Sequence, residues 1–61
     1  MNLYTVTIRT EELGRNTYHV SAKDARSALD KAYKKCWREL KNYPGKQHMY
    51  VTCLELQQEN W

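Results

Sequence analysis

The chain has 61 residues, with ten Lys and Arg against seven Asp and Glu, which gives a formal net charge of +3. A chain of this length buries only about 60% of the surface that its unfolded form exposes, so we expect one domain over residues 1–61, with a thin core and no deep pocket. Two cysteines are too few for the disulfide framework of a small secreted domain. No signal-peptide pattern opens the chain, and no apolar run approaches the ~20 residues that span a bilayer. These features favour a cytoplasmic protein.

The first part of the chain has the pattern of a β-hairpin. Residues 3–10 alternate between apolar and polar side chains, and most of them are β-branched or aromatic, which predicts a strand. Residues 11–16 contain a glycine and an asparagine and predict a loop somewhat longer than the tight two-residue type. Residues 17–22 alternate again, so we expect a second strand that returns along the first.

After Ala22 the apolar period changes from two to about 3.6 residues, which predicts a helix. Its apolar face consists of Ala25, Ala28, Leu29, Ala32, Cys36 and Leu40. We expect Asp24 to be the N-cap, with Ser21 as the alternative, because a side-chain oxygen accepts hydrogen bonds from the free N–H groups of the first turn. Pro44 and Gly45 are expected to end the helix, because proline lacks an N–H group and disfavours the helical conformation in the residue before it.

Residues 48–56 predict a third strand that is apolar on both faces. In this strand Met49, Val51 and Cys53 alternate with Tyr50, Leu54 and Leu56. One helix covers only one face of a sheet, so we expect an α+β fold of ββαβ order. It has a three-stranded antiparallel sheet in the order 3-1-2, with the helix packed on one face. Residues 57–61 either continue the third strand or fray.

In this layout an apolar patch lies on the open face of the sheet, away from the helix. The helix is expected to cover Tyr4, Val6, Ile8, Tyr18, Val20, Met49, Val51 and Cys53. An exposed apolar patch marks a contact surface, so we expect a protein–protein interface with a second copy, as a homodimer, or with another protein. Its residues are Leu3, Tyr50, Leu54, Leu56 and Trp61, with Arg9 and His19 at the rim. A one-residue slip of the third strand would exchange its two faces.

The outer side of the helix is a second candidate surface, because positions three and four apart are neighbours there. Its basic residues are Lys31, Lys34, Lys35, Arg38 and Lys41. Tyr33 and Trp37 border this surface and Tyr43 follows the helix, so cations and rings could bind the phosphates and bases of a nucleic acid. The alternatives are a solvated helix face without a ligand, and aromatic rings that seal the edge of the core.

The sequence contains no recognisable catalytic or metal-binding pattern. Cys36 and Cys53 are expected to be buried as small apolar residues, with a disulfide or a reactive thiol as the alternatives. His19 and His48 would complete a zinc site with them only if all four side chains converged, and their spacing matches no zinc motif. With two glycines the chain has no phosphate-binding glycine loop, and no nucleophile with its base or carboxylate pair is evident. We therefore expect neither enzyme activity nor a cofactor.

Two features of the chain resemble known proteins. Residues 20–29, VSAKDARSAL, are similar to the strand-to-helix junction of many small αβ proteins. The whole chain, one compact domain rich in Tyr, Lys and Gln, resembles the small accessory proteins of tailed bacteriophages and prophages. That resemblance implies a bacterial cytoplasm and a role in modifying host or defence proteins by binding them.

Overall fold

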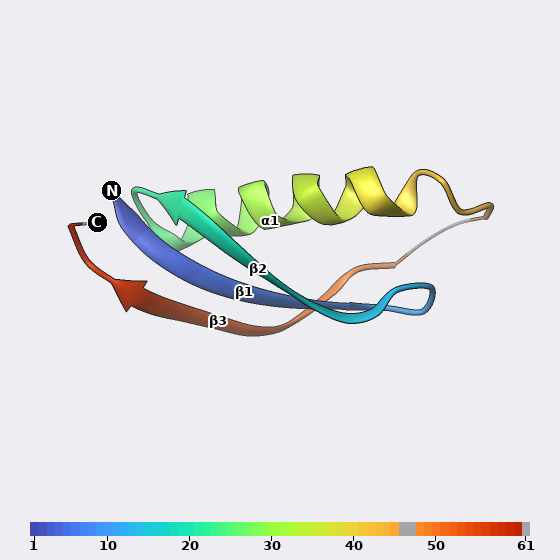
Figure 1. Cartoon of the computed structure of the whole chain (residues 1–61), viewed down its shortest axis with the longest axis horizontal. Coiled ribbons are helices and arrows are strands. Elements are labelled where there is room, and N and C mark those ends of the chain that lie inside the picture. Colours follow the sequence, from blue (N-terminus) through green and yellow to red (C-terminus); the bar gives the residue numbers. More distant parts are fainter. Residues whose placement is uncertain (46–47, 61) are drawn as a thin grey trace.

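The computed structural model describes residues 1–45 and 48–60, which form three strands and one helix (Figure 1). In chain order these are β1 (Asn2–Thr10), β2 (Gly14–Ala22), α1 (Ala25–Leu40) and β3 (Tyr50–Gln58). The strands form one antiparallel sheet in the order β2-β1-β3, and α1 packs on one face. This confirms the predicted ββαβ fold, because the orders 2-1-3 and 3-1-2 are equivalent. Within the described residues, no helix is both long and apolar enough to cross a membrane.

The loop between β1 and β2 is residues 11–13, shorter than predicted. Gly14 adopts a left-handed conformation (φ +72°) opposite Thr10, which allows the chain to reverse in so few residues. Leu13 N donates a hydrogen bond to Thr10 Oγ1 at 3.0 Å, and Asn16 Nδ2 donates to Leu13 O at 3.2 Å. Gly14 supplies the positive φ of the turn, so Asn16 is not needed in the loop and belongs to β2.

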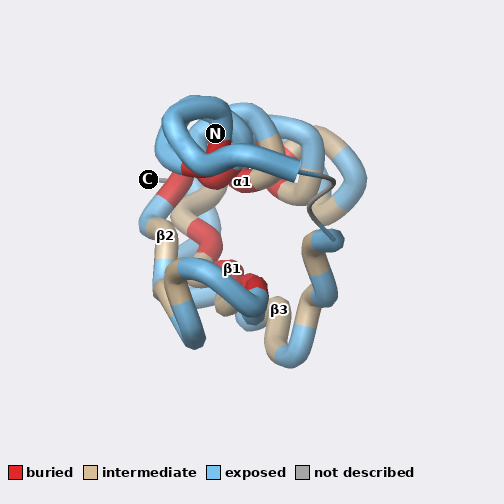
Figure 2. Tube along the Cα trace, turned by 90° about the vertical axis from the view of Figure 1, so that its right-hand side faces the viewer, coloured by how far each residue is buried: buried red, intermediate tan, exposed pale blue. Residues whose placement is uncertain are grey.

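The core lies between α1 and the adjacent face of β1 and β2 (Figure 2). Its buried apolar residues are Tyr4, Val6, Ile8, Val20, Ala22, Ala28, Ala32, Cys36 and Leu40. The helix contacts mainly β1 and β2. β3 contains no fully buried residue, so the helix covers this strand only in part.

Both ends of α1 are stabilised by local hydrogen bonds. Asp24 is the N-cap, as predicted, and its Oδ1 accepts a hydrogen bond from Ser27 N at 2.8 Å. This hydrogen bond lowers the pKa of the Asp24 carboxyl. At the other end the helix stops at Leu40, before the predicted breakers Pro44 and Gly45. Tyr43 N donates to Leu40 O at 2.9 Å, so a tighter turn replaces the helix ahead of the proline.

The orientation of β3 differs from the prediction. Leu54 lies opposite Val6, and Leu56 lies opposite Tyr4. Residues directly opposite each other in an antiparallel pair share a face, and Val6 and Tyr4 are buried under the helix. The assignment of Leu54 and Leu56 to the open face was therefore wrong, because both lie on the helix side.

The pairing of β3 with β1 is irregular at two places, Thr52 and Gln57, and the irregularity at Thr52 explains this error. Val51 lies opposite Ile8 and Cys53 lies opposite Thr7, which leaves Thr52 as an extra residue in β3. One extra residue exchanges the two faces of a strand from that point onward. Val51 therefore faces the helix as predicted, but Cys53, which was predicted to point inward, lies on the open face. Val51, Leu54 and Leu56, which the prediction divided between two faces, share the helix face of the bulged strand, whereas Tyr50 and Cys53 lie on the open face.

Candidate binding surfaces

The open face of the sheet is mainly polar. Its side chains come from Leu3, Thr5, Thr7, Arg9, Arg15, Thr17, His19, Ser21, Tyr50, Cys53, Glu55 and Gln58. Thr5 Oγ1 lies 3.4 Å from His19 Nδ1, and Thr7 Oγ1 lies 3.1 Å from Thr17 Oγ1. Hydrogen-bonding pairs thus occupy the middle of the face on which an apolar patch was predicted.

The residues of the predicted interface are dispersed. Leu3 and Tyr50 lie on the open face, but at opposite ends of the pairing between β1 and β3. Leu54 and Leu56 lie on the helix side, and Trp61 lies outside the described residues. The open face therefore lacks the apolar centre that motivated the prediction.

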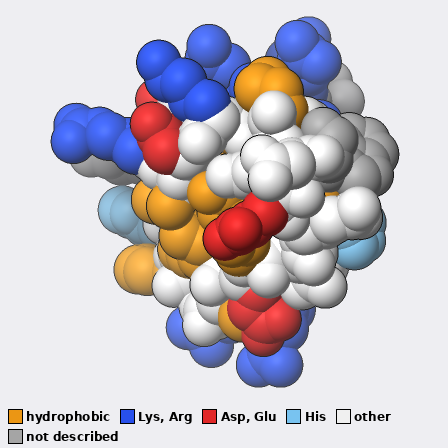
Figure 3. All heavy atoms as spheres, turned by 90° about the vertical axis from the view of Figure 1, so that its left-hand side faces the viewer, with side chains coloured by type: hydrophobic (Ala, Val, Ile, Leu, Met, Phe, Trp, Pro, Cys, Tyr) orange, Lys and Arg blue, Asp and Glu red, His pale blue; other side chains and the backbone are white. Residues whose placement is uncertain are grey.

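An apolar strip lies instead on the helix side of the sheet, between α1 and β3. The strip consists of Leu29 and Tyr33 of α1 with Val51, Leu54 and Leu56 of β3. All but Leu56 are partly buried against the core, and Leu56 is 46% exposed. Figure 3 views the end of the molecule where β1 begins, and hydrophobic side chains gather there between the helix and the sheet. The chain itself thus covers the apolar strip incompletely.

The outer edge of β3 exposes backbone hydrogen-bonding groups. Thr52 Oγ1 donates to Thr7 O at 3.4 Å, so the backbone of Thr7 points toward β3. The backbone N–H and C=O groups of Cys53, which pairs with Thr7, point back toward β1. The direction of these backbone groups alternates from one residue to the next, so those of Leu54 and Leu56 point to the outer edge. Among the residues that the structure describes, these outer groups have no hydrogen-bond partner.

The opposite edge of the sheet, at β2, is covered by side chains. Lys31 Nζ donates a hydrogen bond to Ser21 O, and Lys35 Nζ donates to His19 O at 3.3 Å. An ammonium group on an edge carbonyl hinders the approach of another strand. Two of the lysines that were predicted as phosphate ligands therefore contribute to the protection of this edge.

A basic groove of about 300 Å³ lies between α1 and β2. It is lined by His19, Val20, Ser21, Lys31, Lys34, Lys35 and Arg38. Lys41 and Trp37, which were predicted to join this surface, do not line the groove. Tyr33 packs against the core, whereas Trp37 is 55% exposed. The groove therefore brings together Lys31, Lys34, Lys35 and Arg38 without the predicted rings.

One hydrogen bond ties β2 to the last turns of α1. Tyr18 OH donates to Glu39 Oε2 at 2.5 Å. Burial of the ring and this hydrogen bond raise the pKa of Tyr18 above its ordinary value of 10.0. The contact helps to hold the helix over β2, away from β3.

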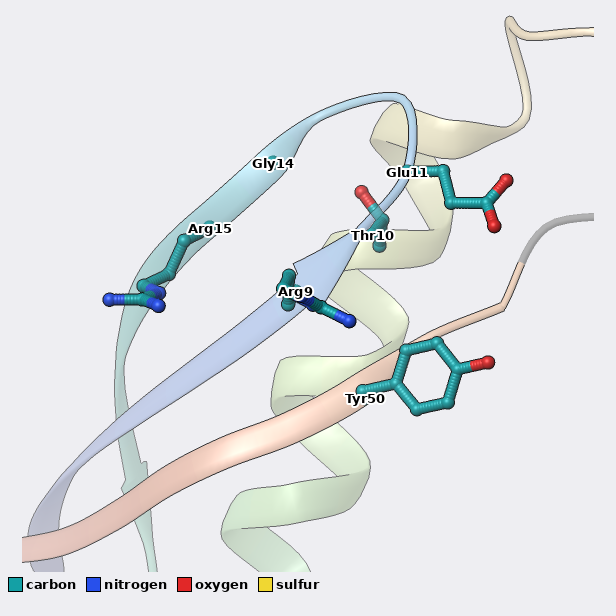
Figure 4. A pocket seen from close by; sticks show the side chains of 6 residues that line it. All are labelled: Arg9, Thr10, Glu11, Gly14, Arg15 and Tyr50. Carbon is teal, nitrogen blue, oxygen red and sulfur yellow. The ribbon is translucent and has the colours of Figure 1, made fainter.

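A hollow of about 480 Å³ lies at the hairpin end of the open face (Figure 4). It is lined by Arg9, Thr10, Glu11, Gly14, Arg15 and Tyr50. Arg9 lies opposite Arg15 of β2 and opposite Tyr50 of β3, so the three residues form one row across the sheet. Arg9 Cζ lies 6.0 Å from the centroid of the Tyr50 ring. This row was not predicted, because the predicted loop, residues 11–16, included Arg15, which the structure places in β2 opposite Arg9.

The cysteines lie on different sides of the sheet and are both free. Cys36 is fully buried in the core, and Cys53 is partly buried on the open face. Cys53 Sγ lies 3.4 Å from Glu55 Oε1, and this hydrogen bond raises the pKa of the thiol. In the described ranges, no three His, Cys, Asp or Glu side chains converge on a point where they could hold a metal ion.

Comparisons with protein-family models, with curated proteins and with solved structures found no match to this chain. The function is therefore inferred from the surfaces described above.

Proposed function

We propose that the protein is a non-enzymatic binding module that acts through a protein–protein interface at the outer edge of β3, and that its first partner is a second copy of itself. The observation that carries this proposal is the difference between the two sheet edges. Lysine side chains cover β2, whereas the outer groups of Leu54 and Leu56 have no partner among the described residues. An uncovered edge strand is a template for pairing with another strand.

The composition of β3 supports this proposal. Its nine residues include no Lys, Arg or Pro, which are the residues that commonly prevent pairing at a sheet edge. Glu55 is its one charged residue, and it lies opposite Thr5 on the open face. The bulge at Thr52 lies toward one end of the strand, so residues 53–56 pair regularly with β1 and offer a regular outer edge.

The apolar strip favours a second copy as the partner. Two β3 strands that pair antiparallel about a two-fold axis join two three-stranded sheets into one of six strands. Opposite residues then share a face, so both helices lie on the same side of the joined sheet. Leu54 and Leu56 of both copies meet between the helices, and the half-exposed Leu56 loses its contact with water. The apolar side of the surface is thus complementary to itself.

Nucleic-acid binding through the basic helix face has less support. Lys31 and Lys35 donate to backbone carbonyls of β2, and Trp37 does not line the basic groove. The alternative interpretation, a solvated helix face without a ligand that also protects a sheet edge, accounts for these contacts.

Static light scattering over a dilution series, in low and in moderate salt, tests the proposal. We expect the wild-type protein to be a dimer at both salt concentrations, because strand pairing and apolar burial depend little on ionic screening. Leu56→Lys is expected to be a folded monomer, since it places a charge within the interface. Thr17→Lys adds the same charge to the exposed side of β2 and is expected to remain a dimer.

Circular dichroism checks that both variants keep the fold. Self-association at β3 would be contradicted by a wild-type protein that stays monomeric at high concentration. It would also be contradicted by a folded Leu56→Lys variant that dimerises as strongly as Thr17→Lys.

A further inference from the structure

Arg9 and Arg15 are two positive charges placed directly opposite each other on the open face. Like charges in this arrangement destabilise a sheet unless an anion lies between them. Within the described part of the chain, neither guanidinium forms an ion pair. Figure 4 shows the two guanidinium groups pointing apart, and the Glu11 carboxylate, also on the rim of the hollow, extends away from them. The hairpin end of the sheet therefore holds two neighbouring guanidinium groups that form no ion pair within the described residues.

The chemistry of this pair suits a phosphate group. Guanidinium groups stay charged and bind phosphate oxygens through paired hydrogen bonds. The Cβ atoms of directly opposite residues are about 5 Å apart, so both long side chains can close on the same phosphate from their separated positions. The hollow beside them, of about 480 Å³, has room for more than a phosphate alone.

The third member of the row supplies an aromatic surface next to the cations. Tyr50 is 52% exposed, and its ring lies beside Arg9. The ring of His48 follows, with its centroid 6.3 Å from that of Tyr50 and its plane tilted by 30°. Exposed rings on a sheet face, adjacent to positive charge, are the usual platform for unstacked bases.

We propose that the row of Arg15, Arg9 and Tyr50 binds single-stranded nucleic acid, with the two arginines on a backbone phosphate and the Tyr50 ring against a base. A single strand is favoured over a duplex, because the ring can reach only a base that is free to leave its stack. The site lies on the open face and does not depend on the proposed self-association at β3.

Fluorescence anisotropy at low salt, with a labelled oligothymidylate and with the duplex that it forms with oligoadenylate, tests this site. We expect the wild-type protein to bind the single strand more tightly than the duplex. Arg15→Gln is expected to weaken binding about tenfold and to reduce the slope of log K against log salt by about 0.7, the value for one lost phosphate contact on a single strand. Tyr50→Leu is expected to weaken binding about tenfold through the lost stacking.

Arg38→Gln is the matched control, because it removes the same charge from the basic groove beside α1. We expect it to change binding less than about twofold, since it leaves the open face intact. The proposal would be overturned by a wild-type protein that does not bind the single strand at low salt, or by a duplex that binds as tightly. Equal losses in Arg38→Gln and Arg15→Gln would also overturn it, because binding would then follow net charge or use the helix face.

Discussion

Leu54 of β3 lies directly opposite Val6 of β1, a residue with no exposed surface, and packs against the same core. Its neighbour Cys53 consequently lies on the open face, opposite Thr7. This arrangement moves the candidate protein interface from the open face to the edge of β3. It also leaves the open face free for the row of Arg9, Arg15 and Tyr50.

A thiol reagent can test the orientation of β3. We expect Cys53 to react in the native protein, and Cys36, which has no exposed surface, to react only after unfolding. The hydrogen bond with Glu55 raises the pKa of the Cys53 thiol, so the native reaction should become faster as the pH rises. Cys53→Ser should abolish the native reaction. Protection of both thiols in the folded protein would mean that Cys53 points inward after all.

Lys31 and Lys35 are expected to keep β2 from pairing with other strands. Replacing both with methionine retains the aliphatic stems but uncovers the two β2 carbonyls. Because both edges of the sheet are then open, sedimentation velocity should detect assemblies larger than a dimer. The control is Lys34→Met with Lys41→Met, which removes the same charge without uncovering the edge. If both double variants form these larger assemblies equally, the lower net charge causes the assembly, and the loss of edge protection does not.

The bond between Tyr18 and Glu39 should make stability depend on pH in the alkaline range. Tyr18→Phe is expected to lower the free energy of unfolding by about 1 kcal/mol at neutral pH, the usual contribution of such a hydrogen bond. The pKa of Tyr18 is raised in the folded state and is near 10 in an unfolded chain. The stabilisation is therefore fully present below about pH 10 and is lost as the pH rises further.

Urea unfolding of wild-type protein and Tyr18→Phe at neutral pH and at about pH 11 measures this effect. The difference between the two proteins should shrink at the higher pH. The deprotonation of lysines is common to both proteins and cancels in the comparison. A difference that is the same at both pH values would show that Tyr18 is not held in its neutral form by the fold.

Much of the fold follows from local sequence patterns. The alternation in β1 and β2, the helical period of α1 and the cap at Asp24 depend on neighbouring residues, and all were predicted. The extra residue at Thr52 depends on how β3 pairs with β1, which is a tertiary property that alternation within one strand does not encode. The length of the hairpin loop likewise kept the row of Arg9, Arg15 and Tyr50 from being predicted. Once Gly14 closes a three-residue loop, Arg9 and Arg15 become neighbours, and the longer predicted loop concealed this pair.

The protected edge of β2 and the apolar strip were not predicted, for a related reason. The basic residues of α1 were recognisable from their spacing, but the carbonyls that Lys31 and Lys35 contact are defined only once β2 is known to be an edge. The apolar strip likewise requires the position of α1 over β1 and β2, which leaves β3 partly uncovered. Packing, and not the composition of either element, creates both surfaces.

Amide hydrogen exchange at Leu54 and Leu56, followed by NMR at high and low protein concentration, is the most direct test of self-association at β3. The amides of Cys53 and Glu55, which face β1, are the internal reference and should be protected at both concentrations. We expect the Leu54 and Leu56 amides to be protected at high concentration and to exchange rapidly on dilution, because only a second strand can cover them. Rapid exchange of these two amides at every concentration, with the reference amides still protected, would contradict pairing at the edge of β3.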